Sequence, residues 1–77
     1  MYIQEVWKEL KSFKKDLEVA DFQQVLHISN YRQLANKSVT NKEGVITRRK
    51  FLVISPSGKI ETIVLGKTYN IISISSR

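Results

Sequence analysis

Three consecutive basic residues, Arg48, Arg49 and Lys50, are the side chains whose types and spacing best suit a chemical task. Arginine forms planar, bidentate hydrogen bonds to phosphate, and lysine supplies a compact positive charge. On a β-strand, Arg48 and Lys50 would project from one face of the sheet and Arg49 from the other. The cluster therefore predicts contacts with the phosphate backbone of a nucleic acid, with affinity supplied by counterion release. The alternative is that these charges only protect an edge strand from aggregation.

The distribution of charge along the chain supports a polyanionic partner. Residues 1–30 carry four lysines and five acidic residues, a net charge of −1, whereas residues 31–77 carry nine Lys and Arg and two acidic residues, a net charge of +7. Such an asymmetry favours a nucleic acid, DNA or RNA, over a membrane as the partner. The further basic residues that we expect in this nucleic-acid-binding surface are Arg32, Lys37, Lys42, Lys59 and Lys67.

The same charge fits a second class of function. A small protein-binding module, acting as an inhibitor or adaptor, would use its positive charge to occupy an acidic surface of a larger bacterial machine. Such a module would bind one protein tightly and free nucleic acid only non-specifically. Both hypotheses describe a regulator, and the small size and the Lys- and Ile-rich composition suggest a bacterial or phage accessory protein.

Aromatic residues decide whether the expected surface could bind unpaired bases. Sheets that bind single strands usually present exposed rings on which bases stack. Tyr31 and Tyr69 are the candidates for this role, and Phe51 is a third ring that fits better into the core. Each tyrosine could equally be a half-buried residue that keeps its hydroxyl in water.

Residues suited to catalysis or metal binding are scarce. His27 is the only histidine and the chain has no cysteine, so no metal site is expected. The three glycines match neither a phosphate-binding loop nor a dinucleotide fingerprint. The serines have only His27 as a base, and Glu43 and Glu61 are the only acidic side chains beyond Asp21. We therefore expect neither an enzyme nor a cofactor.

A long amphipathic pattern lies near the N-terminus. The apolar residues that recur at alternating spacings of three and four are Ile3, Val6, Leu10, Phe13 and Leu17. This spacing predicts a helix over residues 2–20. The same stripe has the heptad form that pairs helices, which makes a homodimer the alternative to packing within the chain. The repeat ends before the roughly three to four heptads of ordinary coiled coils, so we favour a helix packed on the chain's own sheet.

Residues 21–44 are ambiguous. A capping box that begins at Asp21 would start a helix with an apolar face, whereas residues 23–29 could equally form a strand. A short strand over residues 34–40 would then lead into a turn that ends at Gly44, where a positive φ is sterically free. A helix-turn-helix is not supported, because the glycine expected at its sharp turn is missing and the apolar positions do not divide into two helices. A divergent winged-helix domain stays an alternative.

The remainder of the chain has the composition of a β-meander. Strands are predicted over residues 45–54, 59–65 and 68–74. Residues 55–58 have the Pro and Gly placement of a type I turn, and Gly66-Lys67 marks the next break. Neither face of the first of these strands is uniformly apolar, so the face that packs on the helix stays undetermined. Short connections of this kind join antiparallel neighbours.

Taken together, these elements predict one α+β domain over residues 1–77, with an N-terminal amphipathic helix packed on an antiparallel meander of three to five strands. No apolar run approaches the roughly 20 residues that a membrane span needs. No secretory-type apolar segment is visible near the N-terminus, so we expect a cytoplasmic protein that does not use a membrane.

Overall fold

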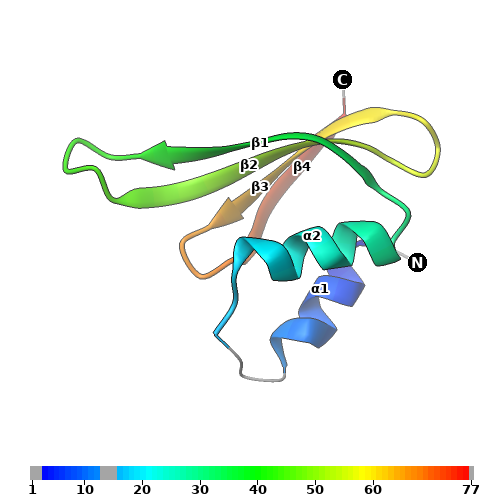
Figure 1. Ribbon diagram of the computed structural model, residues 1–77, viewed down its shortest axis with the longest axis horizontal. Helices are drawn as coiled ribbons and strands as arrows, with labels where there is room; N and C mark the ends of the chain where they lie inside the picture. The colour runs from blue at the N-terminus through cyan, green and yellow to red at the C-terminus, as the bar shows by residue number, and fades with distance from the viewer. Residues whose placement is uncertain (1–2, 13–15, 77) are drawn as a thin grey trace.

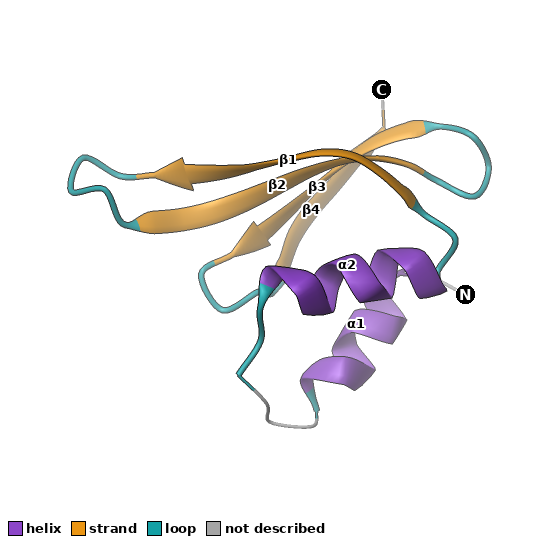
Figure 2. Ribbon diagram, in the orientation of Figure 1, coloured by secondary structure: helices purple, strands orange, loops and turns teal. Residues whose placement is uncertain are grey.

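The computed structural model describes residues 3–12 and 16–76. Within these residues the elements follow in the order α1 (Ile3–Lys11), α2 (Val19–Ile28), β1 (Arg32–Thr40), β2 (Ile46–Ile54), β3 (Ile60–Gly66) and β4 (Ile71–Ser76). The strands form one antiparallel sheet in the order β1-β2-β3-β4, and both helices lie against the same face of it (Figures 1 and 2). The predicted α+β class, with an N-terminal helix packed on an antiparallel meander, is confirmed.

The single helix predicted over residues 2–20 is wrong in its extent. α1 and α2 are separate helices, and the backbone of residues 16–18 is not helical. The hydroxyl of Ser12 donates a 2.6 Å hydrogen bond to the carbonyl oxygen of Glu9, so this side chain competes for a backbone acceptor where α1 ends. The heptad spacing continues across the break because Leu17 returns to the same core from outside α1.

The ambiguous segment begins as a helix, α2. The Asp21 carboxylate accepts a 2.7 Å hydrogen bond from the backbone N–H of Glu18, so the helix cap lies before the predicted one. At the other end, Asn30 adopts a left-handed conformation with φ of 61°. The N–H of Tyr31 then donates to the carbonyl oxygen of Leu26 at 2.8 Å, which satisfies an orphaned acceptor of the last turn. The helical alternative is therefore correct, and the strand alternative is wrong.

The turn between β2 and β3 lies where it was predicted, whereas the turn between β3 and β4 extends into the predicted third strand. The N–H of Gly58 donates to the carbonyl oxygen of Ser55 at 2.9 Å, which closes the expected turn between β2 and β3. The predicted third strand starts too early, because residues 67–70 form a turn in which Tyr69 has a φ of 62°. Threonine and tyrosine have high strand propensity, so the composition of this turn resembles a strand. β4 begins only at Ile71.

The core lies between the helices and one face of the sheet. Its fully buried apolar members are Ile3, Trp7, Phe22, Val25, Leu26, Phe51, Val53, Ile63 and Leu65. The rings of Trp7 and Phe22 meet edge to face with centroids 5.0 Å apart, and Phe22 meets Phe51 in the same way at 4.9 Å. The indole Nε1–H of Trp7 also donates a hydrogen bond to the carbonyl oxygen of Tyr69. These contacts join α1, α2, β2 and the turn before β4.

The apolar stripe near the N-terminus is used by the chain's own core. Ile3 is buried, and Val6, Leu10 and Leu17 are half-buried side chains packed against the core. Phe13, the remaining member of the predicted self-association stripe, lies outside the described residues. The described part of the stripe therefore faces inward, as expected for a helix packed on its own sheet.

Replacing Trp7 with phenylalanine removes the donor to Tyr69 and leaves a void among buried side chains. We expect the free energy of unfolding to fall by about 2–4 kcal/mol, because an unpaired acceptor and a cavity both destabilise. Urea unfolding followed by far-UV circular dichroism measures this loss. The control is Ile28→Ala, at a side chain that is 56% exposed, and it should change the free energy by less than about 0.5 kcal/mol. Equal effects of the two substitutions would contradict this packing.

Candidate nucleic-acid interface

We call the face of the sheet that is turned away from the helices the open face (Figure 2). Successive side chains of a strand point to opposite faces, and the pairing of the strands carries this assignment across the sheet. Because Phe51 and Val53 are buried under the helices, their neighbours in β2 point to the open face. Its assigned residues are Arg32, Ala35, Lys37 and Val39 of β1, Arg48, Lys50, Leu52 and Ile54 of β2, Ile60, Thr62 and Val64 of β3, and Ser73 and Ser75 of β4.

Two lysines of the open face stand directly opposite each other. Lys37 of β1 is the ladder partner of Lys50 of β2, and Arg48 follows two residues along β2, opposite Val39. Like charges that face each other across an antiparallel pair are destabilising. The assigned residues of the open face include no acidic side chain, and in the described part of the chain these three basic side chains form no ion pair. Their positive charge is therefore available to an external anion.

Arg49 belongs to the other side of the sheet. Its guanidinium carbon lies 5.5 Å from the centroid of the Tyr69 ring, in a cation–π contact. Its Nη1 donates a 3.2 Å hydrogen bond to the hydroxyl of Ser38. The structure therefore separates Arg49 from Arg48 and Lys50, as strand alternation predicts, and gives Arg49 partners within the chain.

The remaining predicted basic residues divide between the two ends of the sheet. Lys42 lies in the β1–β2 turn and Lys67 in the β3–β4 turn, at the end of the sheet nearer to Arg48 (Figure 1). Lys59 lies in the β2–β3 turn, at the opposite end, where Arg32 is also found. All of them are exposed. The first group lies at the end of the sheet where Arg48 pairs with Gly66, and the second lies at the end where Arg32 pairs with Ile54.

Neither predicted stacking residue lies on the open face. Tyr31 and Tyr69 are half-buried and pack against the core on the helix side of the sheet. The assigned residues of the open face include no aromatic ring on which bases could stack. The surface is therefore suited to phosphate and sugar contacts rather than to unpaired bases.

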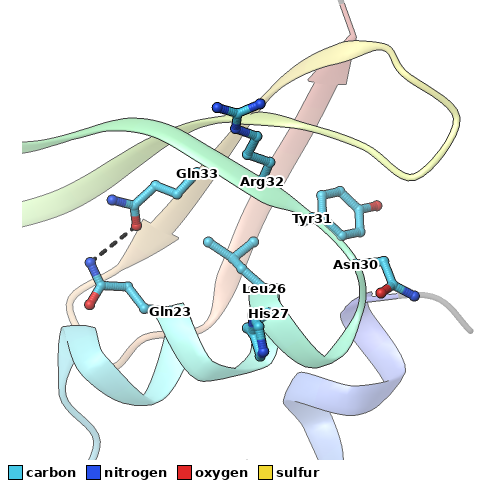
Figure 3. Close-up of a pocket in the computed structure, with 7 residues that line it drawn as sticks. All are labelled: Gln23, Leu26, His27, Asn30, Tyr31, Arg32 and Gln33. Carbon is cyan, nitrogen blue, oxygen red and sulfur yellow. Dashed lines mark hydrogen bonds between the residues drawn. The ribbon is translucent and has the colours of Figure 1, made fainter.

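A hollow of about 550 Å³ lies between the end of α2 and the start of β1 (Figure 3). It is lined by Gln23, Leu26, His27, Asn30, Tyr31, Arg32 and Gln33. The side-chain amides of Gln23 and Gln33 are joined by a 3.1 Å hydrogen bond on one side of it. The lining gives His27 no serine, threonine, cysteine or lysine to activate as a nucleophile. Among the described residues, no group of three or more His, Cys, Asp or Glu could hold a metal ion.

A second hollow, of about 410 Å³, contains a polar pair that sequence reasoning missed. Burial raises the pKa of the Tyr31 hydroxyl above its ordinary value, and the charge of Glu61 and a hydrogen bond to it raise this pKa further. Glu61 Oε1 is itself buried, with no hydrogen-bond partner among the described residues. The sequence held a signal for this pair, because Glu61 alternates with Ile63 and Leu65 on the face that those residues bury.

Comparison of this chain with protein-family models, with curated proteins and with solved structures found no match. No helix within the described residues is both long enough and apolar enough to cross a membrane.

The raised pKa of Tyr31 predicts that the free energy of unfolding falls at alkaline pH. The folded pKa lies above the unfolded value, first through burial of the hydroxyl and then through Glu61. The stability linked to the neutral Tyr31 hydroxyl is therefore complete below about pH 10 and is lost as pH rises through the folded pKa. We expect the free energy of unfolding to fall more steeply above about pH 10 in the wild type than in Tyr31→Phe. Urea unfolding at a series of pH values measures both slopes. Parallel slopes would show that Tyr31 carries no such linkage.

Proposed function

We propose that this protein binds nucleic acid through phosphate contacts made by the open face. The observation that carries the proposal is the opposed pair of Lys37 and Lys50, with Arg48 beside it and no acidic side chain among the assigned residues of this face. Like charges held face to face destabilise the folded chain, and a bound polyanion offsets that repulsion because each lysine is attracted to its negative charge. Release of the counterions of the polyanion adds to the affinity.

The three basic side chains offer different contacts to a phosphate backbone. Arg48 can donate two parallel hydrogen bonds to one phosphate, and the lysines supply point charges. Residues two apart on a strand are about 6.6 Å apart, so Arg48 and Lys50 can meet different points along the backbone. Lys42 and Lys67, in the turns at the same end of the sheet, extend the positive surface.

Contacts of this kind position a protein on nucleic acid without reading its sequence. The protein would then act as a regulator by occupancy, because a bound stretch of nucleic acid is closed to other proteins. Such a role needs no catalytic group and no cofactor.

A second candidate function is that of a protein-binding module for an acidic surface. An apolar group on the open face favours the protein-binding function. Leu52, Ile54 and Ile60 lie together there, and Ile60 is 40% exposed. Apolar side chains between charges suit a protein surface better than a phosphate backbone. Tight stoichiometric binding to one protein, with only salt-sensitive binding to nucleic acid, would identify this second function.

The substitution Lys50→Gln should change stability and binding in opposite directions. We expect the free energy of unfolding to rise by about 0.2–1 kcal/mol, because the repulsion from Lys37 is relieved. We expect affinity for labelled duplex DNA to fall, and the slope of log affinity against log salt to become shallower by about 0.9 for the lost phosphate contact. Urea unfolding and fluorescence anisotropy measure the two effects.

The matched control is Lys8→Gln, because Lys8 is an exposed lysine of α1 on the helix side of the sheet. This control should leave the salt slope unchanged. Equal losses of affinity in the two variants would mean that only net charge matters, and would contradict a site on the open face. Loss of stability in Lys50→Gln would contradict the opposed-charge argument.

A further inference from the structure

The end of the β1–β2 hairpin extends beyond the rest of the sheet (Figure 1). The last residue of β3, Gly66, pairs with Arg48, so residues 39–47 pair only within the hairpin. We call residues 39–47 the hairpin tip. Every residue of the tip is exposed except the half-buried Val39. The tip is therefore a free two-stranded ribbon that is open on both faces.

The backbone of the hairpin tip is held by its own hydrogen bonds. The side-chain oxygen of Asn41 accepts from the N–H groups of Glu43 and Val45, at 2.8 and 3.0 Å. The N–H of Gly44 donates to the carbonyl oxygen of Asn41 at 3.1 Å, and Gly44 has a φ of 81°, which favours glycine. A turn that is ordered in advance loses little entropy on binding.

The exposed side chains of the tip match the chemistry of base-pair edges. Thr40 offers a hydroxyl that can donate or accept, and Lys42 offers a cation for the acceptors of guanine. Val45 and Ile46 are 46% and 37% exposed, and apolar side chains of this kind contact the methyl group of thymine. Neither Val45 nor Ile46 belongs to the core, so packing of the core does not require an apolar side chain at either position.

We propose that the hairpin tip enters the major groove of duplex DNA, an inference that rests on the proposed nucleic-acid function. The major groove of B-form DNA is about 12 Å wide and admits a two-stranded ribbon, whose strands are about 4.8 Å apart. Lys37, Arg48 and Lys50 lie at the base of the tip, on the open face. With the tip in the groove, these side chains reach the phosphates that border it.

Other nucleic acids fit this arrangement less well. Single-stranded nucleic acid is held by aromatic rings that stack on bases, and neither the hairpin tip nor the assigned residues of the open face include one. Duplex RNA has a deep and narrow major groove that side chains cannot read. The hairpin tip therefore fits duplex DNA better than single-stranded nucleic acid or duplex RNA.

The substitution Glu43→Gln tests contact between the tip and DNA, because Glu43 is the acidic residue of the tip and is exposed. Anisotropy would be measured with a short labelled DNA duplex, the RNA duplex of the same sequence and one DNA strand, at several salt concentrations. We expect Glu43→Gln to tighten binding to duplex DNA roughly threefold at a given salt concentration, because it removes a negative charge that repels the phosphates at close range. The control Glu5→Gln, at an exposed residue of α1, should bind as the wild type does.

The wild type should also prefer duplex DNA to the other two probes, and a ligand that fills the minor groove should not displace it. Similar affinity for all three probes, with Glu43→Gln no different from Glu5→Gln, would overturn the hairpin inference and leave the proposed function standing. Preference for the single strand, or displacement by the minor-groove ligand, would overturn it as well. Absence of binding to every probe at near-physiological salt would overturn both proposals.

Discussion

The contact of Trp7, Phe22 and Phe51 is the interaction on which the rest of the structure depends. It joins both helices to β2 and, with the buried aliphatic residues around it, forms a core on one side of the sheet. The open face follows from this one-sided packing, since both described helices are used to cover the same side.

β2 links the core to the charged residues, because buried and charged side chains alternate along it. Its alternation places Phe51 in the core, the outer members of the Arg48–Lys50 cluster on the open face, and Arg49 over the ring of Tyr69 on the helix side. A slip of one residue in the strand register would expose the buried face and move the charges inward, so the core holds the register strongly. This holds for β2 against β3, whereas β1 has no buried residue. The neighbouring pair of Ser38 and Arg49, which is joined by a 3.2 Å hydrogen bond, supports the pairing of Lys37 with Lys50 from the helix side.

Local patterns predicted those parts of the fold whose causes are local. The placement of Pro and Gly at residues 55–58 predicted the turn between β2 and β3, and the Arg48–Lys50 cluster was visible as consecutive basic residues in the sequence. The helix over residues 2–20 failed as a prediction, because heptad spacing does not distinguish one long helix from two segments that return to the same core. The pairing of Lys37 with Lys50 lies between two register shifts of the β1–β2 pair, and the shift between Val39 and Thr40 separates it from the turn. No pattern within one strand predicts such shifts, since they arise from pairing between strands.

Nuclear magnetic resonance mapping tests most directly whether the open face and its hairpin bind nucleic acid. Backbone amide shifts would be followed while a short DNA duplex is added at near-physiological salt. We predict that the shifts concentrate in β1, β2 and the hairpin between them, and that α1 and α2 change little. Shifts that concentrate in the helices, or that spread evenly over the surface and vanish with added salt, would contradict this account of the protein.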